Sequence, residues 1–338
     1  MTSTNFRVAK ERLPVDREER FESLHSYFCE LRAWAEEVDG EWEIAVTRPD
    51  RAAYYVDPNL ASGLEWYSRT FGAVDVAGIA HAVHRSPAFQ LSLNDSWTLW
   101  SWALWLNRRS LSDLDVTILH VDDHDDLMTP RLLVRDRMID ALTGNEFRLD
   151  APSTVESAIR SGAIGVGSFM SPFIRAASRV DVRHLCATEY ARKRQGQFRL
   201  VPTSMPDALL HPSDVSPGLR LDPPVPGEQI DRRYSVTDDL DLWLSDLRPG
   251  PVLLHVDMDY FNNRFNCSSD WQHSDNHDPD PAQVLSRIDE MIDALRRCAV
   301  LERIENIAIA LSPGFFPAEL WQPSIELMQR LLPSSVEV

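Results

Sequence analysis

Most of what the sequence reveals about the fold lies in two segments, ILHVDDHDD at 118–126 and LLHVDMDYF at 253–261. Both start as a short apolar run, share the letters LHVD, and continue with further acidic residues. Short runs that are apolar throughout are typical of strands covered on both faces, as in a parallel sheet. Each segment therefore predicts a buried strand that ends in a group of acidic side chains.

Further apolar runs alternate with segments of helical periodicity. The predicted strands are 88–93, 115–121, 163–169, 251–256 and 306–311, and the predicted helices are 16–38, 96–108, 153–161, 282–300 and 317–332. This alternation predicts an α/β fold with three layers, α/β/α. We expect residues 1–15 to form an N-terminal extension, and the length of residues 16–338 allows one large domain or two ordinary ones.

Seven prolines interrupt the segment 201–229. Proline lacks the backbone N–H group and does not fit the interior of a strand or helix. The segment is therefore predicted to be a loop. A loop of this length is often a lid or binding loop, and a surface excursion or domain linker is the alternative interpretation.

The composition excludes several classes of protein. Against 34 basic residues the chain has 52 acidic ones, a net charge of −18, which disfavours nucleic acid and anionic membranes as partners. No run of eighteen apolar residues and no signal-peptide pattern occurs, so we expect a cytoplasmic protein. The four cysteines form no CxxC pair and predict neither a zinc ribbon nor a disulfide framework.

The acidic residues after the two strands have the spacing of metal ligands. Side chains alternate along an extended segment, so Asp122, His124 and Asp126 can point one way, as can Asp257 and Asp259. Such carboxylates would repel one another unless a cation neutralised them. Carboxylates with one imidazole favour a harder divalent ion such as Mn²⁺, with Fe²⁺ or Zn²⁺ as alternatives.

Less specific interpretations of these residues exist. DDHDD alone is compatible with a solvated acidic loop, although two such groups, each at the end of a buried strand, favour a metal site. His120 and His255 share the parity of the ligands but lie deeper in the strands. We expect these two histidines to support the ligands or to fill the core.

The DxHxD and DxD motifs resemble the metal signature of the arginase and deacetylase superfamily. Within it, LHVDDHDDLMTP followed by HVDMDYF is most similar to the peptide arginase branch. The resemblance implies a single arginase-like domain with an eight-stranded, mainly parallel sheet. It also implies two Mn²⁺ ions, and an arginine-containing ribosomal precursor peptide whose arginine is hydrolysed to ornithine with release of urea.

The resemblance also assigns roles to residues. It implies that Asp122 and Asp257 bridge two ions, that His124 and Asp259 complete one site, and that Asp126 serves the other. Asp126 and His124 are the predicted catalytic residues, with Asp126 holding the attacking water as a hydrogen-bond acceptor. The expected ligands and their catalytic function therefore come from the ends of two strands.

One histidine ligand of the superfamily is missing, because its place reads SLNDSW, with Asn94 or Asp95 there. Asp95 is the candidate replacement. His81 or His84 could instead reach the site from elsewhere, or the second ion could bind weakly.

The residues that would bind substrate are less well defined. A buried guanidinium needs a carboxylate partner in fork geometry. Glu319 is the candidate near the end of the last strand, with Asp123 and Asp125 as alternatives. Ser312 and Asn263 are further candidates at the mouth of the site.

The sequence leaves open the role of the tryptophans and the choice between several functions. The tryptophans of the 96–108 helix could stack on a ligand, but their spacing favours core packing. The alternative functions are hydrolysis of a small free guanidino compound, hydrolysis of an acetylated amine, or an inactive, metal-stabilised binding protein.

Overall fold

The computed structural model describes residues 4–48, 56–107, 109, 114–188, 192–227, 229–268 and 270–332. Its largest element within these ranges is a nine-stranded sheet. In spatial order the strands are β12 (Val215–Asp222), β11 (Gly196–Pro206), β13 (Arg232–Thr237), β10 (Arg179–Leu185), β6 (Asp115–Val121), β14 (Val252–Asp257), β15 (Ile304–Ala310), β5 (Gln90–Ser92) and β4 (Val83–Arg85).

The sheet is mixed. From β13 through β10, β6, β14 and β15 to β5, each strand is parallel to its neighbour. Strands β11 and β12 at one edge and β4 at the other are antiparallel additions. The α/β fold class is confirmed, but the sheet differs from the eight-stranded, mainly parallel one that the resemblance implied.

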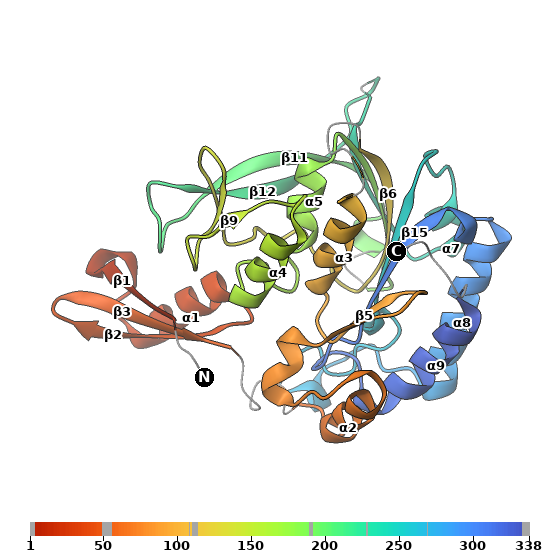
Figure 1. Cartoon of the computed structure of the whole chain (residues 1–338), viewed down its shortest axis with the longest axis horizontal. Helices are drawn as coiled ribbons and strands as arrows, with labels where there is room; N and C mark the ends of the chain where they lie inside the picture. The colour runs from red at the N-terminus through yellow and green to blue at the C-terminus, as the bar shows by residue number, and fades with distance from the viewer. Residues whose placement is uncertain are drawn as a thin grey trace.

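Helices cover both faces of the sheet (Figure 1). One group consists of α3 (Trp97–Leu106), α4 (Pro152–Ser161) and α5 (Met170–Ala176), and the other of α2 (Leu60–Phe71), α7 (Leu240–Leu244), α8 (Pro281–Arg297) and α9 (Trp321–Leu331). On β6, Val116 and Ile118 pack into the core of the first group, and Leu119 and Val121 into that of the second. This arrangement is compatible with the predicted three layers.

Several predicted helices are present, with local signals that explain their limits. Helix α8 starts after Asp280, whose side chain forms a capping box with Gln283, and Pro281 occupies the first turn. Helix α3 contains the tryptophan-rich segment. Its residues Trp97 and Trp102 are fully buried in the hydrophobic core, as expected from core packing rather than ligand stacking.

The N-terminal region differs from its prediction. The helix predicted over 16–38 is α1 (Arg17–Phe28), which ends where Cys29 adopts a positive φ of 49°. The following residues form β2 (Arg32–Val38), which pairs with β3 (Glu41–Thr47). Strand β1 (Thr4–Ala9) lies within the predicted extension and completes an antiparallel sheet in the order β1-β3-β2. We call residues 4–47 the N-terminal unit.

In the proline-rich segment 201–229, β11 and β12 form a hairpin where the sequence predicted a continuous loop. Only Gly196–Arg199 of β11 pair with β13, so Pro202 and Pro206 lie where β11 has a single neighbour. Pro217 lies on the edge strand β12. The prolines thus occupy edge positions, where a missing N–H group is tolerated.

The strand predicted at 163–169 is also wrong. That segment belongs to a turn-rich connection between α4 and α5, and it contains two glycines. The strand β10 was not predicted, and it occupies a central position beside β6. None of the helices in the described ranges has the length and apolar character that a membrane span requires.

Candidate metal centre

The two acidic segments meet at one edge of the sheet. Strands β6 and β14 are parallel neighbours, and His120 is paired in register with His255. Asp122 and Asp257 therefore emerge side by side at the carboxyl ends of their strands, on the face that α3, α4 and α5 cover. Ligand sites in open parallel sheets form beyond these ends. The predicted juxtaposition of the two strand ends is present in the structure.

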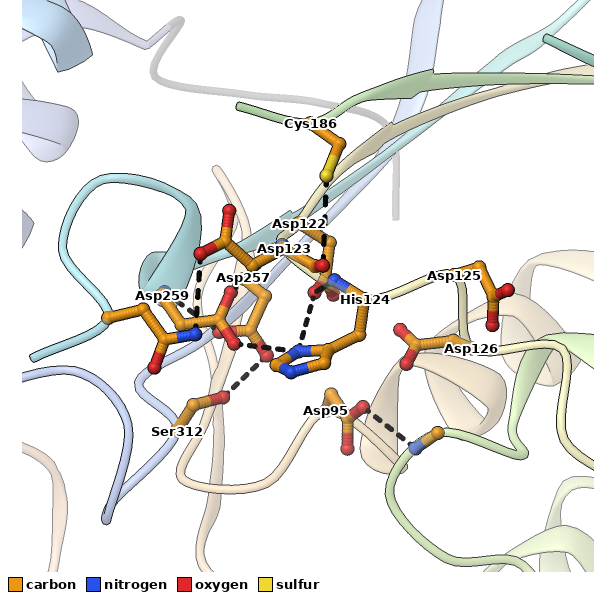
Figure 2. A network of polar contacts seen from close by, with 12 residues as sticks. Asp95, Asp122, Asp123, His124, Asp125, Asp126, Cys186, Asp257, Asp259 and Ser312 are labelled. Carbon is orange, nitrogen blue, oxygen red and sulfur yellow. Dashed lines mark hydrogen bonds and ion pairs between the residues drawn. The ribbon is translucent and has the colours of Figure 1, made fainter. Parts of the chain in front are cut away.

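His124 lies at the middle of the resulting cluster. Its Nδ1 atom is 3.0 Å from Asp259 Oδ2 and 3.3 Å from Asp122 Oδ1. In Figure 2 the ring lies between Asp257 and Asp259 on one side and Asp95 and Asp126 on the other. The His124 side chain is 43% exposed, whereas the carboxylates around it are buried. Solvent therefore reaches the cluster from the side of His124.

Backbone hydrogen bonds fix the two motifs locally. The N–H group of His124 donates to Asp122 Oδ1 at 2.7 Å, and that of Asp259 donates to Asp257 Oδ1 at 3.0 Å. The motifs are also tied together, since the N–H group of Asp123 donates to Asp259 Oδ1 at 3.2 Å. These bonds engage one oxygen of each aspartate, and the second oxygen of Asp122 accepts no hydrogen bond.

Two overlapping groups of side chains bring ligand atoms within 4.8 Å of one another, and Asp122 belongs to both. The first comprises His120, Asp122, Asp126 and His255, and the second comprises Asp122, His124 and Asp259. The buried cluster could therefore hold a metal ion. Asp257 and Asp95 belong to neither group, nor do His81 and His84.

Asp95 nevertheless lies at the centre. It is 5% exposed, and its Oδ2 atom accepts a hydrogen bond from the N–H group of Gly167 at 3.3 Å. Burial raises its pKa well above the ordinary value, and the neighbouring carboxylate of Asp126 raises it further. An aspartate thus stands where the superfamily resemblance leads one to expect a histidine.

The electrostatics of the cluster are unfavourable without a cation. Burial raises the pKa values of Asp122 and Asp257 well above normal, and neighbouring carboxylates add to the effect. Burial also raises the pKa of Asp126, to about 7. The carboxylate of Asp259 raises the pKa of His124 to about 11 against the effect of burial. Each group favours the protonated form because negative charge is concentrated here.

Lysine and arginine side chains do not compensate these charges. Across the described ranges, no lysine or arginine forms an ion pair with Asp95, Asp122, Asp126 or Asp257. Asp95 Oδ1, Asp122 Oδ2 and Asp126 Oδ2 are buried and accept no hydrogen bond. Leaving such oxygens unpaired is costly. A donor set of carboxylates and imidazole without thiolate fits a harder divalent cation.

Two residues of the centre adopt left-handed backbone conformations that non-glycine residues rarely use. Asp126 has a φ of 51° and Ser312 a φ of 43°. The hydroxyl of Ser312 donates a hydrogen bond to Asp257 Oδ2, which gives this predicted substrate residue a role in orienting a carboxylate. Strain of this kind is characteristic of functional sites.

A row of three histidines lies beneath the acidic residues. His184 on β10, His120 on β6 and His255 on β14 are paired in register across neighbouring strands. The Nε2 atom of His184 lies 3.0 Å from the carbonyl oxygen of Asp122, and that of His120 lies 2.9 Å from the carbonyl oxygen of His124. Since a carbonyl only accepts, both nitrogens donate, and both rings hold the ligand-bearing segment.

The donor and acceptor roles of the Nδ1 atoms of these histidines follow from this assignment. Burial lowers the pKa of His184 to about 4 and that of His255 to about 3, so these rings are neutral. His120 Nδ1 then accepts the bond of 2.9 Å from His255 Nδ1. His184 Nδ1 accepts from the hydroxyl of Tyr234. These contacts favour the predicted supporting role for His120 and His255, although both contribute atoms to a possible ligand group.

His184 was missed at the level of sequence, because the strand β10 was missed. The only available signal was a third run, VDVRHL at 180–185. Its histidine is the penultimate residue, as in the strand runs 115–121 and 251–256. The register that aligns this residue with His120 comes from pairing between distant parts of the chain.

The predicted substrate residues lie at different distances from the cluster. Glu319 is exposed, forms an ion pair with Arg264, and accepts a hydrogen bond from Asn59 at 3.1 Å. This placement does not support the guanidinium-binding role predicted for it. Asn263 is buried, and its amide donates to Asp123 Oδ2 at 3.3 Å. Asn263 therefore borders the centre.

No protein-family model and no curated protein matches the sequence. The two motifs and the geometry around them are therefore the features of the chain that indicate its chemistry.

Proposed function

We propose that this chain is a manganese-dependent hydrolase of guanidinium C–N bonds, a peptide arginase that converts peptidyl arginine to ornithine and releases urea. The observation that carries the proposal is the buried group of carboxylates with unpaired oxygens around His124. The order DxHxD and DxD at the ends of β6 and β14 supports the arginase-like assignment. The identity of the metal and of the substrate are parts of this proposal.

The proposed ligands form two overlapping sets. Asp122 and Asp257, from neighbouring strand ends, would bridge two Mn²⁺ ions. His124 and Asp259 would complete one set, and Asp126 with Asp95 the other. When bound, divalent ions stabilise developing negative charge and lower the pKa of water.

The side chains of the protein have further tasks in the proposed reaction. Asp126, buried and held on a left-handed backbone, would accept a hydrogen bond from the attacking water and so orient it. The ring of Phe315 lies edge-on to His124, with centroids 5.4 Å apart, and forms an apolar wall on the accessible side. A flexible arginine side chain would enter along this wall, because the other ligands are buried.

An arginine-containing precursor peptide is the proposed partner. The net charge of −18 attracts a cationic peptide over distance, which raises the association rate and does not set specificity. The branch resemblance, rather than the charge, favours a peptide over free arginine.

A urea-release assay tests the proposal. We expect the Mn²⁺-loaded protein to release one urea per ornithine formed from an arginine-containing peptide, and to be slower on free arginine. Parallel reactions with an acetyl-lysine peptide and with small guanidino compounds test the alternative hydrolase activities. If the protein binds Mn²⁺ but releases no urea from any guanidino substrate, the proposed activity is wrong.

A further inference from the structure

The loop Gly162–Ser168 connects the metal centre with a distant part of the chain. At one end, the N–H group of Gly167 donates to Asp95 Oδ2 at 3.3 Å. The carbonyl oxygen of Gly167 accepts a bond of 2.9 Å from the N–H group of Met128, two residues beyond Asp126. The position of Gly167 therefore influences two of the proposed ligands at once.

A side chain at this position would crowd the acidic segment. Gly167 has a φ of 73°, and an added Cβ would lie 3.0 Å from the sulfur of Met128. It would also lie 3.8 Å from Asp126 Oδ1. The loop thus passes directly against the acidic segment, and a displacement of the loop would change the surroundings of Asp95 and Asp126.

Arg131 holds the other end of the loop. Its side chain is nearly buried and donates to the carbonyl oxygens of Gly162 at 2.6 Å and Tyr27 at 2.8 Å. The Arg131 backbone N–H group donates to the carbonyl oxygen of Ala163 at 2.8 Å. A third nitrogen of the guanidinium lies 3.6 Å from Glu30 Oε2. Tyr27 and Glu30 belong to the N-terminal unit, so Arg131 joins that unit to the loop.

The N-terminal unit also packs on the loop directly. A Cβ added at Gly162 would lie 2.7 Å from Leu31 Cδ1, and one added at Gly165 would overlap the carboxyl group of Glu30. A β-carbon at either position would therefore require Leu31 or Glu30 to move. The N-terminal unit and the loop are thus in close contact.

We infer that the N-terminal unit is a positioning element of the metal centre: through Arg131 it holds the loop whose Gly167 orients Asp95 toward Asp126. A planar guanidinium that donates to two carbonyl oxygens from different nitrogens restricts their relative position more than a single ammonium group would. The inference rests on the metal binding in the proposed function and is independent of its substrate.

Calorimetric titration of the full chain with Mn²⁺ tests the inference. Arg131→Lys keeps the charge but cannot bind both carbonyl oxygens in a fork. We expect it to weaken the binding of one Mn²⁺ about tenfold, the scale of effect seen when partners of metal ligands are removed. In an Asp95→Asn background the same substitution should cause little further loss, because the two residues act on the same ion.

Arg135→Lys is the matched control. Arg135 forms an exposed ion pair with Asp214, and its replacement should leave both Mn²⁺ affinities unchanged. Thermal unfolding of the metal-free variants measures any general loss of stability. If Arg131→Lys does not fold, Gly165→Ala displaces Glu30 at the same contact and should show the same dependence on Asp95.

The outcomes separate this inference from the proposed function. Unchanged affinity in a folded variant, or equal losses with and without Asp95, would overturn the positioning role. A wild-type protein that takes up no Mn²⁺ would overturn the proposed function and this inference together. If the loss of Mn²⁺ affinity in Arg131→Lys depends on Asp95 but the protein releases no urea, the positioning role is supported and only the proposed activity is wrong.

Discussion

Two buried acidic sites on neighbouring strands are compensated in opposite ways. Asp181 on β10 is fully buried, and its oxygens lie 3.0 Å from Arg183 Nε and 2.7 Å from Arg233 Nε. Asp122, directly after β6, is also buried, but only histidines form its ion pairs. The chain supplies two guanidinium groups to the first site and none to the second.

The difference shows what distinguishes a structural carboxylate from a candidate ligand. A buried charge is stable only when it is paired and hydrogen-bonded. Asp181 meets this condition with groups of the chain itself. The cluster around Asp122 does not, and unpaired oxygens remain on Asp95, Asp122 and Asp126. The second site therefore requires protons or an external cation.

The largest expected effect is on the metal centre. Asp257→Ala should remove a bridging carboxylate and lower urea release at least about a thousandfold, because metal ions supply several kcal/mol of transition-state stabilisation. Metal analysis should show a parallel loss of bound Mn²⁺. Asp241→Asn, at an exposed residue, serves as the control and should leave urea release and bound Mn²⁺ unchanged. Full turnover by Asp257→Ala would mean that the site lies elsewhere.

The second prediction is that replacing aspartate by asparagine changes the free energy of unfolding in opposite directions at the two sites. Asp181→Asn leaves two guanidinium groups without their charged partner and should lower the free energy of unfolding by about 3 kcal/mol. In the metal-free protein, Asp126→Asn should instead raise it by about 1 kcal/mol. Urea denaturation of chelator-treated protein measures both values. A loss of stability in both variants would contradict the distinction.

The third prediction concerns pH. The pKa of Asp126 is raised by burial to about 7 in the folded protein, from the ordinary 3.8. Between about pH 4 and pH 7 the folded metal-free protein therefore binds more protons than the unfolded chain, and its free energy of unfolding should fall as the pH rises. Thermal unfolding at several pH values measures this slope, which should be smaller in Asp126→Asn.

Metal binding should show the opposite trend. A carboxylate must lose its proton before it binds a cation, so Mn²⁺ affinity should fall about tenfold per pH unit below pH 7 for one such group. Titrations at pH 5, 6 and 7 measure it. An affinity independent of pH over this range would show that Asp126 is not a ligand.

The smallest expected effect tests the substrate-binding role predicted for Glu319. Glu319→Gln should change KM for an arginine-containing peptide less than about twofold, because an exposed ion pair contributes little. Its pairing with Arg264 keeps it outside the acidic cluster. A large rise in KM with unchanged kcat would restore Glu319 as a guanidinium-binding residue.

Several features could be predicted from sequence because their signals are local. An apolar run followed by acidic residues identified β6 and β14, and Asp280-Pro281 identified the start of α8. Other features could not be predicted, since they depend on contacts between distant residues. Trp34 continues the helical spacing of α1, but its segment pairs with β3. The prolines of β11 are tolerated because that part of the strand has a single neighbour.

The amino-acid sequence alone determined the chemistry available to this protein, because ligand type and spacing are properties of contiguous residues such as Asp122, His124 and Asp126. Only the tertiary structure decided which of these groups meet, and that Asp95 joins them while Glu319 does not. It also placed His184 beneath Asp122 and the N-terminal unit against Gly162 and Gly165 of the loop that contains Gly167. Strand register and packing across the sheet produce these contacts, and no local pattern encodes them.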